Sequence, residues 1–186
     1  MRVVKLISGG QTGADRGGLR AAARLGLERG GCVPKGRRAE DGCVPTEFKE
    51  MTELESPLYA ARAEHNVLSS AATVVFTRGE LRGGSAQVFE MARVYERPAR
   101  WLNLGDGQPL AAHAVELRAW LDALPMGSGA VNVAGQRESR SPGIETEVEN
   151  ALVFALSEEP DVALVRRSLE AALTPVAPSA PTGHDA

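Results

Sequence analysis

The chain of 186 residues contains few aromatic side chains and no long apolar run. Phe, Trp and Tyr make up only 4% of the residues. This argues against nucleic-acid modules that stack bases on aromatic rings. No apolar run reaches the roughly 20 residues that span a membrane, and the chain opens on a strand pattern instead of a signal peptide. We therefore expect a cytoplasmic protein with no nucleic-acid partner and no membrane partner.

Cysteine and histidine are also scarce. Cys32 and Cys43 are the two cysteines, and without a secretory signal we do not expect a structural disulfide between them. The three histidines are scattered and lack the spacing of a zinc site, so no resident metal is predicted. The net charge of −3 gives no general attraction for DNA or anionic lipid. Any site for an anion must therefore be local.

The chain does contain short apolar runs that alternate with amphipathic stretches. Strands are predicted at 3–7, within 30–34, and at 73–77, 100–104 and 130–134, while the segment 43–57 is predicted to be irregular. Helices are predicted from Thr12, as N-cap, to about Leu25, and at 59–70, 86–95, 110–124 and 144–156, with Ser56 and Pro57 at the start of the second. This order predicts an α/β fold, a Rossmann-like, doubly wound, mostly parallel sheet with helices on both faces.

The predicted domain organisation is simple. Residues 1–156 form the Rossmann-like ligand-binding domain, with a core made mainly of Val, Leu and Ala. Residues 157–186 form a C-terminal extension that is partly helical, over 162–173, and disordered from 174 onward.

The stretch Val3–Gly18 reads VVKLISGGQTGADRGG, an apolar run followed by a Gly-rich turn and the start of a helix. A helix start carries unpaired N–H groups and partial positive charge, so this turn is a candidate cradle for a phosphate or oxyanion. An ordinary strand-to-helix connection is the plainer alternative. The glycines at 9, 10 and 13 fit neither the P-loop nor the dinucleotide fingerprint, which disfavours a nicotinamide dehydrogenase.

Two later stretches repeat this pattern, and parallel strands place their carboxyl ends at one edge of a sheet. We therefore expect the loops 8–13, 83–85 and 135–143 to converge with the basic loop 35–38, although a solvated surface is an equally good interpretation of that basic run. Backbone amides, hydroxyls and cations together suit an anion with several oxygens. The candidate ligand-binding residues are Ser8, Gly9, Gly10, Gln11, Thr12, Gly13, Lys35, Gly36, Arg37, Arg38, Gly83, Gly84, Ser85, Gly135, Arg137 and Ser139.

Catalytic groups are harder to identify. The chain has no G-x-S-x-G elbow and no Cys–His pair at a recognisable spacing. Asp15, Glu40, Asp41, Glu64 and Glu90 lie near the candidate loops, but capping or ion pairing is the favoured interpretation for each carboxylate. Binding is therefore better supported than catalysis.

Four segments in order carry a family resemblance: SGGQTGADRGGL, GGCVPKGRRAEDGCVP, YAARAEHNVLSSAATVVFTRGELRGGS and VNVAGQRESRSPGI. Together they resemble the molybdenum carrier (molybdenum cofactor carrier) family, within a Rossmann-like superfamily that includes the lysine-decarboxylase-like phosphoribohydrolases. The resemblance covers Val3–Leu156. It implies a Rossmann-like fold, a homo-oligomer (dimer or tetramer), and binding of molybdenum cofactor, or a related nucleotide, phosphate or oxyanion ligand, without turnover.

Two alternative functions stay open. The phosphoribohydrolases carry PGGxGTxxE, whose Glu contributes to catalysis, and the comparable stretch here, RGGSAQVFE, has Glu90 in that place. Arg82, Ala86 and Gln87 replace the Pro, the third Gly and the Thr, which speaks against a nucleotide 5′-monophosphate phosphoribohydrolase. A nucleotide-sensing regulatory module would bind a nucleotide without turnover and act through a partner protein.

Overall fold

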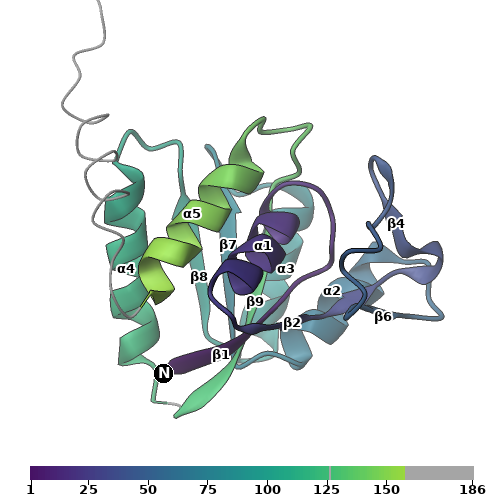
Figure 1. Cartoon of the computed structure of the whole chain (residues 1–186), viewed down its shortest axis with the longest axis horizontal. Coiled ribbons are helices and arrows are strands. Elements are labelled where there is room, and N and C mark those ends of the chain that lie inside the picture. The colour runs from purple at the N-terminus through teal and green to yellow at the C-terminus, as the bar shows by residue number, and fades with distance from the viewer. Residues whose placement is uncertain (126, 158–186) are drawn as a thin grey trace, which may run out of the picture.

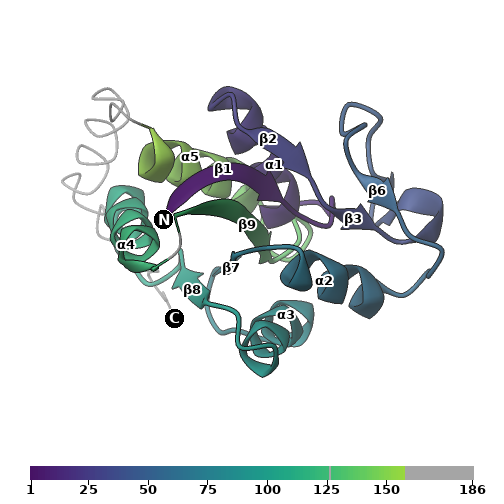
Figure 2. The ribbon, with the colours of Figure 1, turned by 90° about the horizontal axis from the view of Figure 1, so that it is seen from below.

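A computed structural model describes residues 1–125 and 127–157. At its centre lies a sheet of five parallel strands in the order β2-β1-β9-β7-β8 (Figures 1 and 2). These strands are β1 (Arg2–Ile7), β2 (Glu28–Gly30), β7 (Ala72–Thr77), β8 (Ala99–Asn103) and β9 (Ser128–Gly135). The predicted α/β, Rossmann-like fold is confirmed. The predicted helix over 162–173 and the predicted disorder from 174 lie outside the described residues.

Helices cover both faces of the sheet (Figure 2). One face carries α1 (Ala14–Arg24), α4 (Leu110–Ala123) and α5 (Ile144–Leu156), and the other carries α2 (Tyr59–Leu68) and α3 (Gly83–Val94). The inner strand β7 is buried at every position, as expected for a parallel strand covered on both sides. Val74 and Phe76 join the core under α1, α4 and α5, whereas Val75 packs under α2 and α3, because alternate residues of a strand face opposite sides.

The predicted cap of α2 and the predicted start of α3 are wrong. Helix α2 begins at Tyr59, so Ser56 is not its N-cap and Pro57 is not its first residue; the Ser56 hydroxyl instead accepts a backbone hydrogen bond two residues on. Helix α3 begins at Gly83 and not at Ala86, so the Gly-Gly-Ser segment is its first turn. The glycines therefore form part of this helix and do not precede it.

Residues 32–53 extend away from the sheet as an arm (Figure 1). The arm contains β3 (Cys32–Val33) paired in parallel with β6 (Thr52–Glu53), a 3₁₀ turn at Lys35–Arg37, and a small antiparallel hairpin of β4 (Arg38–Ala39) and β5 (Gly42–Cys43). The predicted short strand within 30–34 is confirmed by β3. Strands β4, β5 and β6 were not predicted, and the irregular segment predicted over 43–57 is wrong where β5 ends and β6 forms. Val33, Val44, Phe48 and Met51 pack against Leu19 of α1 and fix the base of the arm.

In the described part of the chain, no helix combines the length and the apolar content needed to cross a membrane.

Candidate functional site

A cleft of about 880 Å³ opens where the chain leaves β1, β7 and β9. This is the carboxyl edge of the sheet, the place where open α/β sheets bind their ligands. The volume lies in the range of small-molecule sites. Three of the four predicted loops do converge on it, through Gln11, through Gly83, Gly84 and Ser85, and through Gly135 and Arg137.

The cleft is rich in positive charge although the chain as a whole is acidic. Two carboxylates line it, Asp15 and Glu80. Its cationic lining consists of Arg62, Arg78, Arg82, Arg137 and Arg140. Guanidinium groups bind phosphate and carboxylate oxygens through paired, charge-assisted hydrogen bonds, so this lining favours an anion.

The first turn of α3 forms part of the cleft wall. Its N-cap residue, Arg82, makes no side-chain capping hydrogen bond. A Cβ placed on Gly83 or Gly84 would meet nothing within 4 Å, so the space beside these two residues is open. The unpaired N–H groups and partial positive charge of a helix start suit an oxyanion at this position.

Another part of the cleft wall is apolar. Ala60 and Ala63 line it from α2, and Val88 and Met91 line it from α3. Together with Ala134 at the end of β9, these apolar side chains suit a flat, weakly polar group. The cleft therefore combines a cationic region with an apolar one, as ligand sites commonly do.

The turn between β1 and α1 is not an open amide cradle. The Gly10 amide donates to Ser8 Oγ at 3.2 Å, the Gln11 amide to Asp15 Oδ2 at 3.3 Å, and the Thr12 amide to Gln11 Oε1 at 3.1 Å. The predicted cradle uses the amides of Gly9, Gly10, Thr12 and Gly13, and the chain's own side chains already accept from two of these, Gly10 and Thr12. Gln11 is the member of the predicted 8–13 set that lines the cleft.

The start of α1 also differs from prediction, because the Thr12 side chain makes contacts outside its own helix. The N-cap is Gly13 and not Thr12, with a φ of 76° that disfavours most side chains. The Thr12 hydroxyl accepts a hydrogen bond from the Glu138 amide at 3.3 Å and donates to Glu40. It therefore joins the β9–α5 loop to the arm and does not cap its own helix.

A buried ion pair joins α2 to the β1–α1 turn. Arg62 Nη1 lies 2.9 Å from Asp15 Oδ2, and their side chains are only 12% and 6% exposed. Burial raises the pKa of the Asp15 carboxyl, and the Arg62 charge opposes that rise. The guanidinium lies where a Cβ of Gly9 would be, so glycine at this position admits the ion pair.

Tyr59, at the start of α2, gathers three guanidinium groups. The Cζ atoms of Arg38, Arg62 and Arg137 lie 5.6, 5.9 and 5.6 Å from the centre of its ring, within cation–π range. The structure thus brings the predicted cations Arg38 and Arg137 together. Arg62 was missed because it sits inside an amphipathic helix; its i, i+3 spacing from Tyr59 is the signal that places both on one helix face.

No cation of the basic loop 35–38 is among the residues that line the cleft. Lys35 pairs at the surface with Glu55 at 3.3 Å, and Arg37 donates to the Phe48 carbonyl at 3.0 Å. Gly36 lies beside them in the 3₁₀ turn. The expectation that these residues converge with the other loops is wrong for Lys35, Gly36 and Arg37, which form contacts within the arm.

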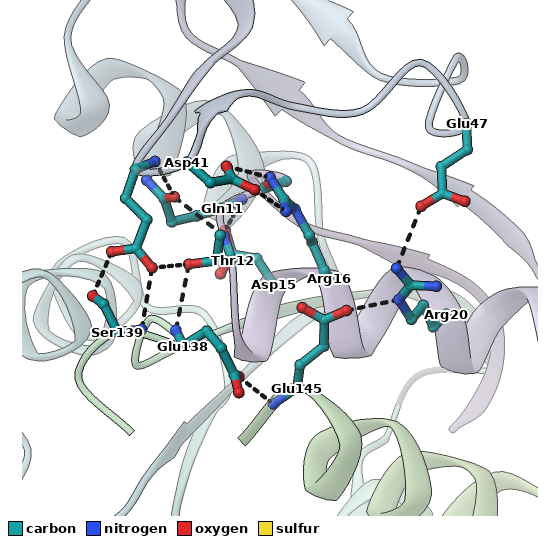
Figure 3. A network of polar contacts seen from close by, with 12 residues as sticks. Gln11, Thr12, Asp15, Arg16, Arg20, Asp41, Glu47, Glu138, Ser139 and Glu145 are labelled. Atoms are coloured by element: carbon teal, nitrogen blue, oxygen red, sulfur yellow. Dashed lines mark hydrogen bonds and ion pairs between the residues drawn. The ribbon is translucent and has the colours of Figure 1, made fainter. Parts of the chain in front are cut away.

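Thr12 and Ser139 do come together, but around a side chain of the arm (Figure 3), and Arg137 lies near the same side chain. Glu40 accepts hydrogen bonds from the Thr12 hydroxyl, from the Ser139 amide at 3.2 Å and from the Ser139 hydroxyl at 2.6 Å, and lies 3.9 Å from Arg137. Burial alone would raise the pKa of Glu40, but these donors outweigh it and lower the pKa.

Arg78 and Gln136 were also missed by the sequence analysis. The Arg78 amide donates to Gln136 Oε1 at 2.8 Å, and Gln136 Nε2 donates back to the Arg78 carbonyl at 3.1 Å. Arg78 further pairs with Glu147 of α5 at 2.7 Å. These contacts hold the loops after β7 and β9 side by side. They depend on strands far apart in sequence, so no local pattern marks them.

Glu90 and metal ligands are the remaining candidates. Glu90 is exposed, pairs with Arg93 at 3.0 Å, and is not among the residues that line the cleft. Within the described ranges, no group of three His, Cys, Asp or Glu side chains is placed to hold a metal ion.

Fold and cleft together define a Rossmann-like domain with a cleft of small-ligand size at the carboxyl edge of its sheet. Residues 6–156 match the circularly permutated YpsA SLOG family, cpYpsA, and the chain belongs to this family. A crystal structure of a protein named "Putative molybdenum carrier protein", from Syntrophus aciditrophicus SB, is similar: the TM-score is 0.76 and the identity 35%, over 83% of this chain and 94% of that one. The resemblance to molybdenum carriers is confirmed. No curated protein matches the chain.

Proposed function

We propose that this protein binds a small phosphorylated heterocycle in the cleft, either molybdenum cofactor or a related nucleotide-type ligand, and holds it without converting it. The observation that carries this proposal is the first turn of α3, which is uncapped and open, beside an arginine-rich and an apolar wall. A phosphate fits the first region and a flat ring fits the second.

The phosphate would meet the amides of Gly84 and Ser85 and the guanidinium of Arg140. Arg78 and Arg82 are already paired, with Glu147 and Glu80. Arg140 makes no ion pair within residues 1–125 and 127–157, so it keeps its charge available for a ligand.

The chemical class of the ligand rests on two supports. Molybdenum cofactor is a phosphorylated pterin, and a nucleotide likewise joins a flat ring to a phosphate. The similar crystal structure carries the name of a molybdenum carrier. A carrier needs affinity and shielding from solvent, which the cleft provides without a catalytic base.

The cleft carboxylates also favour holding over hydrolysis. Asp15 is engaged by Arg62, and Glu80 by Arg82. Glu90, which a phosphoribohydrolase would use, lies outside the cleft lining. Neither lining carboxylate is therefore unengaged and ready to act as a general base.

A matched pair of substitutions at Gly84 tests the site. Gly84→Asp places a negative charge at the start of α3, where it stabilises the helix but repels a phosphate, whereas Gly84→Asn has nearly the same shape without the charge. We expect the wild type and Gly84→Asn to bind guanosine 5′-monophosphate alike in calorimetry, and Gly84→Asp to bind at least about tenfold more weakly, a loss of about 1.4 kcal/mol.

Mass spectrometry of the small molecule that copurifies with the native protein identifies the physiological ligand. Chromatography after incubation with nucleoside monophosphates should detect no released base. Equal binding by Gly84→Asp and Gly84→Asn would place the phosphate elsewhere, and base release by the wild type but not by Glu90→Gln would favour the hydrolase.

A further inference from the structure

We propose that Thr12, Ser139 and Arg137 form a second oxyanion-binding pocket, and that Glu40 occupies it as an internal ligand. The pocket adjoins the cleft through Arg137, which lines the cleft and also lies 3.9 Å from the Glu40 carboxylate. An oxyanion from solution, or a second anionic group on the cleft ligand, takes the place of the Glu40 carboxylate. The second case rests on the proposed function, whereas the first does not.

The pocket has the composition of an oxyanion site. Two hydroxyls, one backbone amide and one guanidinium converge on a single carboxylate. The Thr12 hydroxyl accepts from the Glu138 amide, so its proton is directed at Glu40. A phosphate or molybdate presents more oxygen acceptors than a carboxylate and would satisfy the same donors.

Gln11 provides an independent sign that the region has capacity for a further acceptor. Its Oε1 accepts from the amides of Thr12 and Glu40 at 3.1 and 2.8 Å, which fixes the orientation of the side-chain amide. Its Nε2 is then a buried donor with no partner among the residues that the structure describes. An unpaired buried donor costs roughly 1–3 kcal/mol, which a ligand oxygen would recover.

Glu40 can leave the pocket without unfolding the arm. Its backbone amide stays bound to Gln11, and the neighbouring Asp41 holds Arg16 through two hydrogen bonds, of 2.6 and 2.9 Å. Asp41 and Glu40 both belong to the exposed hairpin 38–43, but only Glu40 enters the pocket. A rotation of the Glu40 side chain is therefore enough to exchange carboxylate for ligand.

The matched variants are Glu40→Ala, which empties the pocket, and Asp41→Asn, which weakens a neighbouring tether and leaves the pocket filled. Inorganic phosphate is the probe, in calorimetry on the full chain. An internal carboxylate competes at a local concentration in the millimolar range or above, so we expect Glu40→Ala to bind phosphate at least about tenfold more tightly in the pocket than the wild type. Asp41→Asn should bind phosphate as the wild type does.

Combining Gly84→Asp with Glu40→Ala tests the pocket separately from the cleft, and therefore separates this inference from the proposed function. The double variant Glu40→Ala, Gly84→Asp should keep one phosphate, bound in the pocket, while its cleft stays empty. If the wild type binds no guanosine 5′-monophosphate but Glu40→Ala binds phosphate, the proposed function fails and the pocket stands. Loss of all phosphate in the double variant overturns the pocket.

Other outcomes also decide the question. Equal phosphate binding by Glu40→Ala and the wild type overturns the inference, and so does an equal gain in Asp41→Asn, which would trace the effect to a loosened hairpin. Glu40→Gln keeps the shape of the side chain and removes its charge, so it retains the fold if Glu40→Ala does not. It should bind phosphate several-fold more tightly than the wild type, and unchanged binding overturns the inference.

A ligand with two phosphates, adenosine 3′,5′-bisphosphate, distinguishes the two sources of the anion. If Glu40→Ala binds it more tightly than the monophosphate, the second anion comes from the cleft ligand and not from free phosphate.

Discussion

Replacing Gly9 with alanine tests the packing of the buried Asp15–Arg62 pair directly. Gly9 is not among the glycines with positive φ, so its backbone accepts alanine without strain. The added Cβ would overlap the Arg62 guanidinium and force it to move. Asp15 would then lose its cationic partner while it stays 94% buried along its side chain, since that side chain is only 6% exposed.

The expected cost follows from the burial of both partners. Breaking a buried ion pair from one side costs about 3–5 kcal/mol, because the remaining charge is left without compensation. Gly9→Ala and Arg62→Ala should each lower the free energy of unfolding by about 3 kcal/mol near neutral pH. Once Arg62 is absent, Gly9→Ala should cost less than about 0.5 kcal/mol, as for a substitution without a contact.

The assay is a double-mutant cycle in urea, with the midpoint and slope of each unfolding curve recorded. A coupling of about 3 kcal/mol between Gly9 and Arg62 supports the assignment. Additive costs, with a coupling inside about 0.5 kcal/mol, would show that the methyl group meets something other than this guanidinium and would refute the reasoning.

Two further predictions concern the arm and the β9–α5 loop. Hydrogen bonds and a cation lower the pKa of Glu40 from its ordinary value of 4.5, so the stability that its ionised form contributes is present above that pH and is lost as the pH falls through the lowered value. The stability difference between wild type and Glu40→Gln, measured by urea unfolding at several pH values, should therefore shrink below about pH 4.5. A difference that stays constant down to about pH 2 would contradict this. Gly13→Ala should lower the free energy of unfolding by about 3 kcal/mol or more in the same assay, because it combines a φ of 76° with a Cβ only 2.6 Å from the Glu138 amide nitrogen. The control is Gly26→Ala, where φ is 64° and a Cβ would meet nothing within 4 Å, and it should cost only about 1–2 kcal/mol.

Much of the fold could be predicted because its signals are local. The β7 strand is a continuous apolar run, and a parallel strand covered on both faces requires such a run. The helix starts were harder, since their capping depends on contacts made elsewhere. Thr12 has the right chemistry for an N-cap, but its hydroxyl is taken by Glu138 and Glu40, which are distant in sequence.

The candidate site was predictable only in its location. The glycines at 83 and 84 carry a local signal, and the structure places them in the cleft wall. The partners of the other groups could not be read from spacing, because they come from the arm and from α2. Arg37 turns to a carbonyl inside the arm, whereas Arg62, within a helix, reaches the cleft. The expected homo-oligomer stays a prediction.

Helix α1 packs almost backbone to backbone against its surroundings. A Cβ on Gly17 would press on the α5 backbone, lying 3.2 Å from the Glu149 amide nitrogen, and one on Gly18 would lie 2.7 Å from the Cβ of Val133 in β9. Larger residues at these two positions would therefore displace α5 or β9, so α1 tolerates little change there. New ligand preferences can arise instead from α2 and α3, which line the cleft. Libraries that seek altered specificity should vary those elements and leave α1 unchanged.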